Sequence, residues 1–249
     1  MSLKFLSADE ARVQGSFTPL LQSNIEAELV EAGAQIEERD GWRVAANYGD
    51  TIAEKKACAE SVGLADLSSL GITELLANPA VIEAITTEVA GTAAKLGEAV
   101  FAGDAWWCTV KPDRVLAISS PGDTASLRGR LESAAAARSE LTSVTDLTST
   151  LTTFSVSGPL ARDTFARITA LDLREREFPL RGFLPGSIGR VPGLLLRQGP
   201  DSFLHSFGAA SAQYMWESMI DAAEELGGRP VGIDALGPLG GAVEATTNA

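Results

Sequence analysis

The sequence predicts an α+β fold made of two tandem split β-α-β-β-α (ferredoxin-like) repeats with pseudo-two-fold symmetry. The main observation is that segments recur along the chain in the same order. The recurring pairs are 66–69 with 146–149, 78–79 with 158–159, and 112–116 with 200–204. A repeat this long indicates two copies of a supersecondary unit rather than a solenoid. Any site is therefore expected where the two copies meet.

The first repeat shows the start and stop signals of its elements. Asn78 can cap a helix that has Pro79 at its first position, where the missing N–H of proline costs nothing. Lys111-Pro112-Asp113 is typical of a turn between two strands. We expect strands over 72–77, 105–110 and 114–119, a helix from Asn78, a second helix over 123–137, and an extra strand over 142–144 that can join the sheet.

The second repeat follows the same order. Strands are expected over 151–157, 193–197 and 202–207, with one helix opened by Gly158-Pro159 and a last helix over 209–226. An inserted segment, 171–190, separates the first helix from the next strand. The last helix carries an apolar stripe expected to be buried, composed of Tyr214, Met215, Met219 and Ile220.

The predicted organisation has four parts. Residues 1–40 form an N-terminal arm, rich in acids and expected to be irregular with at most short helices. The first repeat spans 41–140 and includes a strand over 41–48 and a helix over 51–61 with Thr51 as its N-cap. The second repeat spans 141–236. The remaining residues, 237–249, form a tail rich in small residues, which is expected to fray.

Charge and composition exclude several classes of function. The chain has 249 residues, 33 of them acidic and 20 basic, for a net charge of −13. This balance opposes binding to nucleic acid or to anionic membranes, which need clustered cations. No signal peptide and no membrane-spanning apolar run is evident, so a cytoplasmic protein is expected.

Cysteine and histidine are scarce, which restricts metal chemistry. Cys58 and Cys108 lack CxxC spacing and are expected to be buried apolar residues. His205 is the single histidine of the chain. We expect it to be a strand residue with its hydrogen bonds satisfied, and we predict no metal site.

Three segments carry a resemblance to a known family. Glu54–Gly71 (EKKACAESVGLADLSSLG) and the strand and helix from Leu116 resemble the glycine cleavage T-protein, an aminomethyltransferase, and its folate-binding relatives. Residues 144–222 are closer to the gamma subunit of heterotetrameric sarcosine oxidase, through "SGPLAR" and "LLLRQGPDS". The resemblance covers about 41–236. It implies a fold around a central tetrahydrofolate cavity, here without the C-terminal barrel of T-proteins.

The same resemblance indicates that the transfer chemistry is missing. The position of the family's catalytic carboxylate falls on Ser126, which cannot hold the charge that an iminium-like intermediate requires. Asp123, one turn earlier, would need a different geometry. The pterin-gripping Glu falls in the shortened 197–201 loop, where Asp201 is a possible replacement. The substrate-lining hairpin is reduced to a short bridge over 101–106. We therefore predict no catalytic residues.

Some residues nevertheless suit a folate. Tyr48 and Trp106 could stack on a pterin, Arg197 could pair with a glutamyl tail, and Asp201 could hold the pterin. Adjacent residues of a strand point to opposite faces. We therefore expect either Trp106 or Trp107 to enter the core and the other to face outward, more often toward a partner than a ligand.

Three hypotheses remain for the function. The first is a non-catalytic structural subunit or binding module, packed against larger flavoprotein subunits that oxidise sarcosine or related N-methyl amines. No cofactor is assigned, although tetrahydrofolate is possible. The alternative is a free-standing tetrahydrofolate-binding protein similar to aminomethyltransferases. A folate-binding assembly factor ranks last, because its "KGCYxGQE" motif is absent from the sequence.

Overall fold

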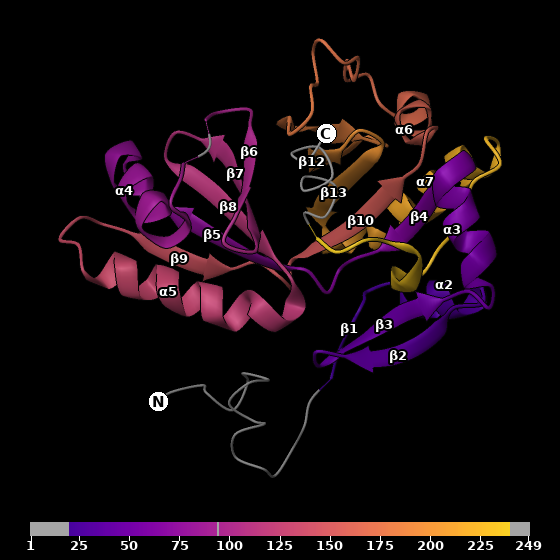
Figure 1. Ribbon diagram of the computed structural model, residues 1–249, viewed down its shortest axis with the longest axis horizontal. Coiled ribbons are helices and arrows are strands. Elements are labelled where there is room, and N and C mark those ends of the chain that lie inside the picture. Colours follow the sequence, from indigo (N-terminus) through magenta and orange to yellow (C-terminus); the bar gives the residue numbers. More distant parts are fainter. Residues whose placement is uncertain (1–19, 94, 240–249) are drawn as a thin grey trace.

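The computed structural model describes residues 20–93 and 95–239 (Figure 1). It has helices and three sheets whose strand pairs are mostly antiparallel, so the α+β class is confirmed. Parts of the predicted arm and tail, residues 1–19 and 240–249, lie outside the described residues.

A small sheet forms from residues that we expected to be irregular. Its strands, in spatial order, are β1 (Leu21–Gln22), β3 (Trp42–Asn47) and β2 (Gln35–Arg39), and α2 (Glu26–Glu31) lies between β1 and β2 in the chain. The prediction for 20–40 was wrong because tertiary contacts override the acid-rich local pattern. Ile25 and Leu29 are buried in the core, and the predicted strand β3 serves as a template for β2.

The second sheet consists mostly of residues from the first half. In spatial order its strands are β6 (Ala99–Ala102), β7 (Ala105–Lys111), β8 (Arg114–Ser119), β5 (Gly71–Leu76) and β9 (Ser143–Asp146). Helices α4 (Pro79–Ala90) and α5 (Thr124–Ala136) pack on one face of this sheet (Figure 1). Asn78 caps α4 as predicted, since its Oδ1 accepts a hydrogen bond from the Val81 N–H at 3.0 Å.

The third sheet has the order β11 (Phe183–Ile188), β12 (Val191–Gly199), β13 (Ser202–Gly208), β10 (Leu151–Ser157), β4 (Gly63–Asp66) and β14 (Arg229–Pro230). Three further helices are α3 (Thr51–Glu60), α6 (Ala161–Ile168) and α7 (Ala212–Glu224). The segment 171–190, expected only to separate two elements, contains β11. This strand forms because it pairs along its whole length with β12.

The two halves of the chain exchange a strand. Strand β4 pairs with β10 of the second half, whereas β9 pairs with β5 of the first. The repeated segments 67–70 and 147–150 are the turns where the chain crosses between the two sheets. We call them the first and second crossover.

The crossovers are fastened by reciprocal hydrogen bonds. In the first, the Leu67 N–H donates to the Thr153 carbonyl at 2.8 Å, and in the second the Leu147 N–H donates to the Ile72 carbonyl at 2.8 Å. The Thr148 hydroxyl oxygen accepts from the Ile72 N–H at 3.0 Å. Ser68 accepts in the same manner from the Thr153 N–H at 3.4 Å. The repeat seen in the sequence is therefore the junction between the sheets.

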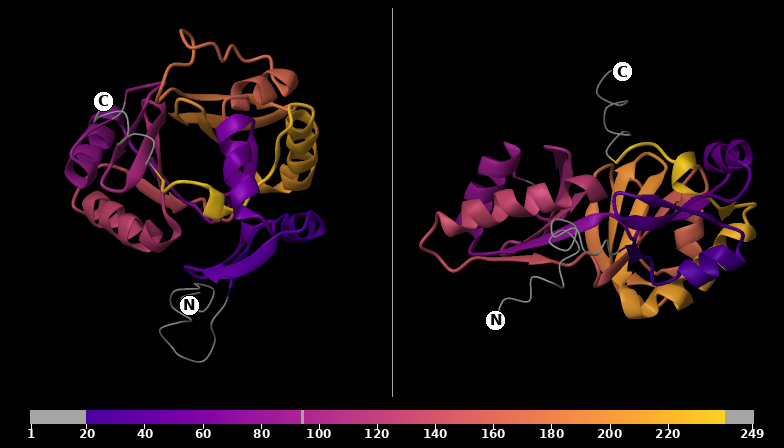
Figure 2. Two further views of the ribbon diagram at one scale, coloured as in Figure 1. Left: turned by 45° about the vertical axis from the view of Figure 1, so that its right-hand side comes forward. Right: turned by 90° about the horizontal axis from the view of Figure 1, so that it is seen from below.

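The sheets also meet at their opposite edges. The Ala99 N–H donates to the Arg181 carbonyl, and the Phe183 N–H donates to the Gly97 carbonyl, both at 2.9 Å. These bonds connect β6 to β11. The two sheets are thus arranged around a common centre, which the segment 231–239 (yellow) approaches (Figure 2).

Both adjacent tryptophans are buried, contrary to the prediction that one faces outward. Trp106 is 0% exposed and Trp107 is 1% exposed. Trp106 packs between the two large sheets, whereas Trp107 packs under α4 and α5. The alternation of a strand still holds, but the sheet is covered on both faces, so each side chain enters a core.

Three smaller predictions were also wrong. Asp50, not Thr51, caps α3, because the Asp50 carboxylate accepts from the Ala53 N–H at 3.0 Å. Tyr214 is 49% exposed, since it lies on the outer side of α7. Cys58 is only half-buried, in contrast to Cys108.

His205 is buried in β13 as expected, but its hydrogen bonds are not satisfied. Neither ring nitrogen has a hydrogen-bond partner among the described residues. The ring packs instead against Phe207, with centroids 4.8 Å apart, and against Phe165. Burial lowers the pKa of His205 from 6.5 to about 3, so the folded protein keeps the ring neutral.

Replacing Thr148 with valine should weaken the second crossover. The change keeps the shape of the side chain but leaves the buried Ile72 N–H without its acceptor. We expect the free energy of unfolding to fall by about 1–3 kcal/mol, measured by urea denaturation. Thr142→Val is the matched control, because the Thr142 hydroxyl donates to the exposed carbonyl of Glu140. This change should alter the free energy of unfolding by less than about 0.5 kcal/mol. Equal effects of the two variants would contradict this role.

The stability of the protein should depend on pH through His205. Below about pH 6.5 the unfolded chain binds a proton on this residue that the folded protein does not. The free energy of unfolding should then fall by about 1.4 kcal/mol for each pH unit between about 6 and 4. His205→Leu should flatten this slope in urea denaturation at a series of pH values. An unchanged slope would show that other groups cause it.

Candidate functional site

A cavity of about 470 Å³ lies at the junction of the two halves. Its wall comes from six parts of the chain: α3, the first crossover, the end of β8, β10, the β12–β13 turn, and the C-terminal segment up to Leu239. The lining residues are Cys58, Leu67, Leu70, Ser120, Ser155, Ser157, Gly158, Gln198, Pro200, Asp201, Ser202, Ile233, and Ala235–Leu239. The position agrees with the expectation that a site would lie where the copies meet.

The polar side chains on one wall bond mainly to one another. Ser157 lies 3.2 Å from the Ser155 hydroxyl and 3.1 Å from the Ser202 hydroxyl, oxygen to oxygen. Gln198 donates from Nε2 to the Ser202 hydroxyl at 2.9 Å. The buried Oε1 atom of Gln198 has no partner within the described part of the chain. The wall therefore offers one free acceptor and a set of hydroxyls that are already paired.

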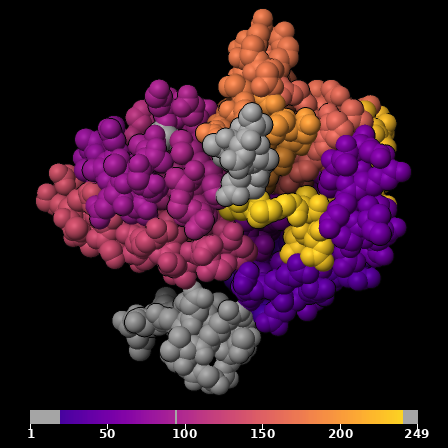
Figure 3. Space-filling model, in the orientation of Figure 1, coloured from indigo at the N-terminus to yellow at the C-terminus, as the bar shows by residue number. Residues whose placement is uncertain are grey.

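The C-terminal segment, residues 231–239, forms another wall (Figure 3, yellow). The buried carboxylate of Glu54 holds it in place, accepting from the Gly232 N–H and the Tyr48 N–H, both at 2.7 Å. Asp234 pairs with Arg39 at 2.6 Å. Only glycine fits at position 232, because a Cβ atom there would lie 2.1 Å from the Ala46 carbonyl oxygen.

Two lining residues have side chains that titrate. Burial, with a smaller effect of Glu54, raises the pKa of the Cys58 thiol to about 11, so it is not a thiolate at neutral pH. Asp201 is exposed and sits in the turn between β12 and β13, where its main-chain carbonyl accepts from the Gly158 N–H at 2.8 Å. Asp201 is the only carboxylate among the described lining residues.

The four residues predicted to contact folate do not meet in the structure. Asp201 lines the cavity, whereas Tyr48, Trp106 and Arg197 do not. Trp106 is enclosed in the core beside Phe101, with ring centroids 5.3 Å apart. The buried Tyr48 hydroxyl has no hydrogen-bond partner among the described residues. Burial and the charges of Asp66 and Glu54 raise its pKa.

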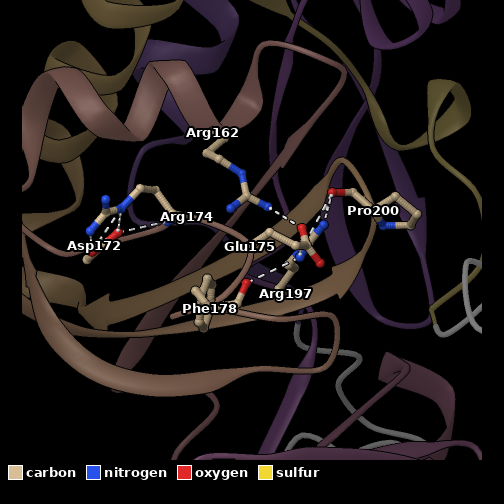
Figure 4. A network of polar contacts seen from close by, with 7 residues as sticks. All are labelled: Arg162, Asp172, Arg174, Glu175, Phe178, Arg197 and Pro200. Atoms are coloured by element: carbon tan, nitrogen blue, oxygen red, sulfur yellow. Dashed lines mark hydrogen bonds and ion pairs between the residues drawn. The ribbon is translucent and has the colours of Figure 1, made fainter.

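Arg197 is fully engaged within the protein (Figure 4). Its guanidinium donates to the Glu175 carboxylate at 2.6 Å, to the Phe178 carbonyl at 3.2 Å and to the Pro200 carbonyl at 2.9 Å. These bonds connect β12 to the segment before β11 and to the β12–β13 turn. A glutamyl tail would have to displace Glu175 to reach this guanidinium.

The position matched to the family's catalytic carboxylate also lies away from the cavity. Ser126 is exposed on α5 and lines a surface hollow with Glu88 and Arg130. Asp123 is exposed at the start of that helix. Ser120, at the end of β8, is the residue from this part of the chain that reaches the cavity.

Two buried acids near the cavity were not identified from the sequence. Glu54 appeared only as the first residue of the segment that resembles the T-protein, and Asp66 only within that segment and the repeat. Burial raises the pKa of Asp66, although hydrogen bonds from Ser68 and Ser23 oppose the shift. No pattern in the sequence could have identified them, because both depend on contacts with distant segments.

The structure gives no support for a metal centre or a membrane anchor in the parts that it describes. Within residues 20–93 and 95–239, no group of three or more His, Cys, Asp or Glu side chains could hold a metal ion. No helix in these ranges is long and apolar enough to cross a membrane.

Comparison with known proteins identifies relatives by sequence similarity. Aminomethyltransferases of Mycobacterium bovis and Mycobacterium tuberculosis are 26% identical to the chain over 240 residues. The match covers 88% of this chain and 62% of each relative. The chain therefore spans somewhat less than two thirds of the length of these curated relatives.

Two solved structures share the fold. The aminomethyltransferase T of the Bartonella henselae glycine cleavage system superposes with a TM-score of 0.74 at 16% identity, covering 87% of this chain and 60% of that chain. One chain of heterotetrameric sarcosine oxidase from Corynebacterium sp. U-96 superposes with a TM-score of 0.60 at 24% identity. The match covers 70% of this chain and 91% of the sarcosine oxidase chain.

The resemblance noted in the sequence is confirmed at the level of the family. The model of the GCVT N-terminal domain matches residues 25–239, which include both large sheets and the cavity. The protein belongs to the GCVT N-terminal domain family.

Proposed function

We propose that this protein is a non-catalytic structural subunit or binding module of a cytoplasmic oxidase assembly. In this role it packs against larger flavoprotein subunits that oxidise sarcosine or a related N-methyl amine. In this proposal the protein has the fold of its family and catalyses no aminomethyl transfer. We also propose two tandem ferredoxin-like repeats as the architecture. The strand order β5-β8-β7-β6 in one sheet corresponds to the order β10-β13-β12-β11 in the other, which supports this architecture.

The chemistry of the cavity wall is the observation that carries the proposal. None of the described lining residues is aromatic or basic, and the single carboxylate, Asp201, lies in an exposed turn. A pterin ring is best held by an aromatic face and by charged or amide groups directed at its edge. The described lining residues include an amide, Gln198, and a carboxylate, Asp201, but no aromatic face, so the stacking contact implied by the family does not fit here.

The neighbours in structure agree with a subunit role. A chain of the sarcosine oxidase shares the fold over 70% of this chain, with a TM-score of 0.60. The sarcosine oxidase is a heterotetramer. A chain of this fold is thus found among the subunits of an oxidase, which supports larger flavoprotein partners for this protein.

The alternative is a free-standing tetrahydrofolate-binding protein similar to aminomethyltransferases. It is favoured by the sequence relatives and by the size of the cavity, which lies in the range of small-molecule sites. The free Oε1 acceptor of Gln198 and the Asp201 carboxylate would be its polar contacts. Tyr48, Trp106 and Arg197 would contribute only after rearrangement of the core.

Purification of the tagged chain from its native host tests the proposal. We expect larger subunits to co-purify in fixed stoichiometry and to carry flavin, measured by mass spectrometry and by flavin absorbance. A tagged, unrelated acidic protein of similar net charge is the control for nonspecific capture. A monodisperse, flavin-free monomer obtained under the same gentle conditions would contradict the proposal.

A further inference from the structure

Two arginines converge on a single carboxylate oxygen outside the cavity (Figure 4). Arg197 of β12 and Arg162 of α6 both contact the Oε2 atom of Glu175, at 2.6 Å and 3.2 Å. The Arg197 side chain is 6% exposed and that of Arg162 is 27% exposed. The guanidinium of Arg162 also lies over the Phe203 ring, 5.9 Å from its centroid.

The charges in this cluster do not balance. The other acceptors of Arg197 are the neutral carbonyls of Phe178 and Pro200, and within residues 20–93 and 95–239 Glu175 is the one carboxylate that pairs with either arginine. The buried Nη1 atom of Arg162 has no partner among the described residues. A buried donor without an acceptor is costly, and a guanidinium pairs best with a planar carboxylate through two parallel bonds. The cluster therefore has positive charge and a donor that Glu175 does not satisfy.

Glu175 is held in a way that allows its side chain to leave. It lies in residues 169–182, a segment between α6 and β11 without helix or strand, and its side chain is 68% exposed. Both arginines contact the Oε2 atom of Glu175, and its Oε1 atom bonds to none of the described residues. Leu173 and Phe178 are buried on either side of it. The side chain of Glu175 can therefore rotate into solvent while the segment stays anchored.

A purely structural role does not require all of these groups. The bonds of Arg197 to Glu175 and Phe178 are sufficient to connect the segment to β12. Arg162 adds a second positive charge that shares the single Glu175 carboxylate with Arg197, and like charges held close together repel each other.

We propose that Arg162 and Arg197 form a binding site for a carboxylate group, which Glu175 occupies internally and an external carboxylate displaces. The external group is either a small organic acid or an acidic side chain of a neighbouring protein. The inference is independent of the proposed subunit role, since the site lies outside the cavity wall.

The test compares Glu175→Ala with Glu177→Ala. Glu177 is the matched control, because it lies in the same segment, is exposed, and pairs only with Arg176. The thermal midpoint is measured during titration with succinate or with a hexaglutamate peptide, at ionic strength held constant with sodium chloride. We expect saturable stabilisation of Glu175→Ala at concentrations at least tenfold lower than for the wild type and for Glu177→Ala. Addition of Arg162→Met to Glu175→Ala should abolish it.

The two ligands distinguish the sources. Stabilisation by succinate identifies a free organic acid, and stabilisation by the peptide alone identifies an acidic side chain of a protein. The proposal is wrong if Glu175→Ala responds no more than Glu177→Ala, or if Arg162→Met leaves the response intact. If Glu175→Ala does not fold, the Nε–H resonance of Arg197 in the wild type should shift saturably with either ligand, and an unchanged resonance would overturn the proposal.

Discussion

The exchange of strands between the two halves is the constraint on which the rest of the structure depends. Each crossover turn donates its leucine N–H to a strand of the other half, and each accepts a strand N–H with its Ser68 or Thr148 hydroxyl. Because β4 and β9 complete the opposite sheets, neither sheet has its full set of strands without the other half. Folding of the two halves is thereby coupled.

This coupling explains both the buried tryptophans and the cavity. The sheets face each other with helices on their outer sides, so Trp106 and Trp107 enter different cores. The first crossover carries Leu67 and Leu70 to the junction, where they line the cavity. The C-terminal segment completes the wall because the buried Glu54 holds Gly232. The cavity is thus a consequence of how the halves join, whatever it binds.

Much of the fold could be predicted because its signals are local. The Asn78-Pro79 helix start and the strands of both hairpins depend on residues close in the chain. The small N-terminal sheet and β11 could not be predicted, since their strands form on templates that come from other segments. The position of Glu54 depends on residue 232, far away in sequence.

The candidate site was harder to predict than the fold. Asp201 was suggested by the resemblance as a replacement for the pterin-gripping Glu, and it lines the cavity. The roles suggested for Tyr48, Trp106 and Arg197 depend on where their side chains point, which the resemblance alone does not determine. The structure places Trp106 in the core and pairs Arg197 with Glu175.

We propose that the protein keeps the fold of its family, while the cavity of the protein lacks the groups that hold tetrahydrofolate. Calorimetric titration of the purified chain with tetrahydrofolate tests it most directly, with Asp201→Asn compared against Asp113→Asn, the equivalent turn residue of the first half. We expect no saturable heat from the wild type or from either variant. Saturable heat that is lost in Asp201→Asn and kept in Asp113→Asn would contradict the account and establish folate binding in the cavity.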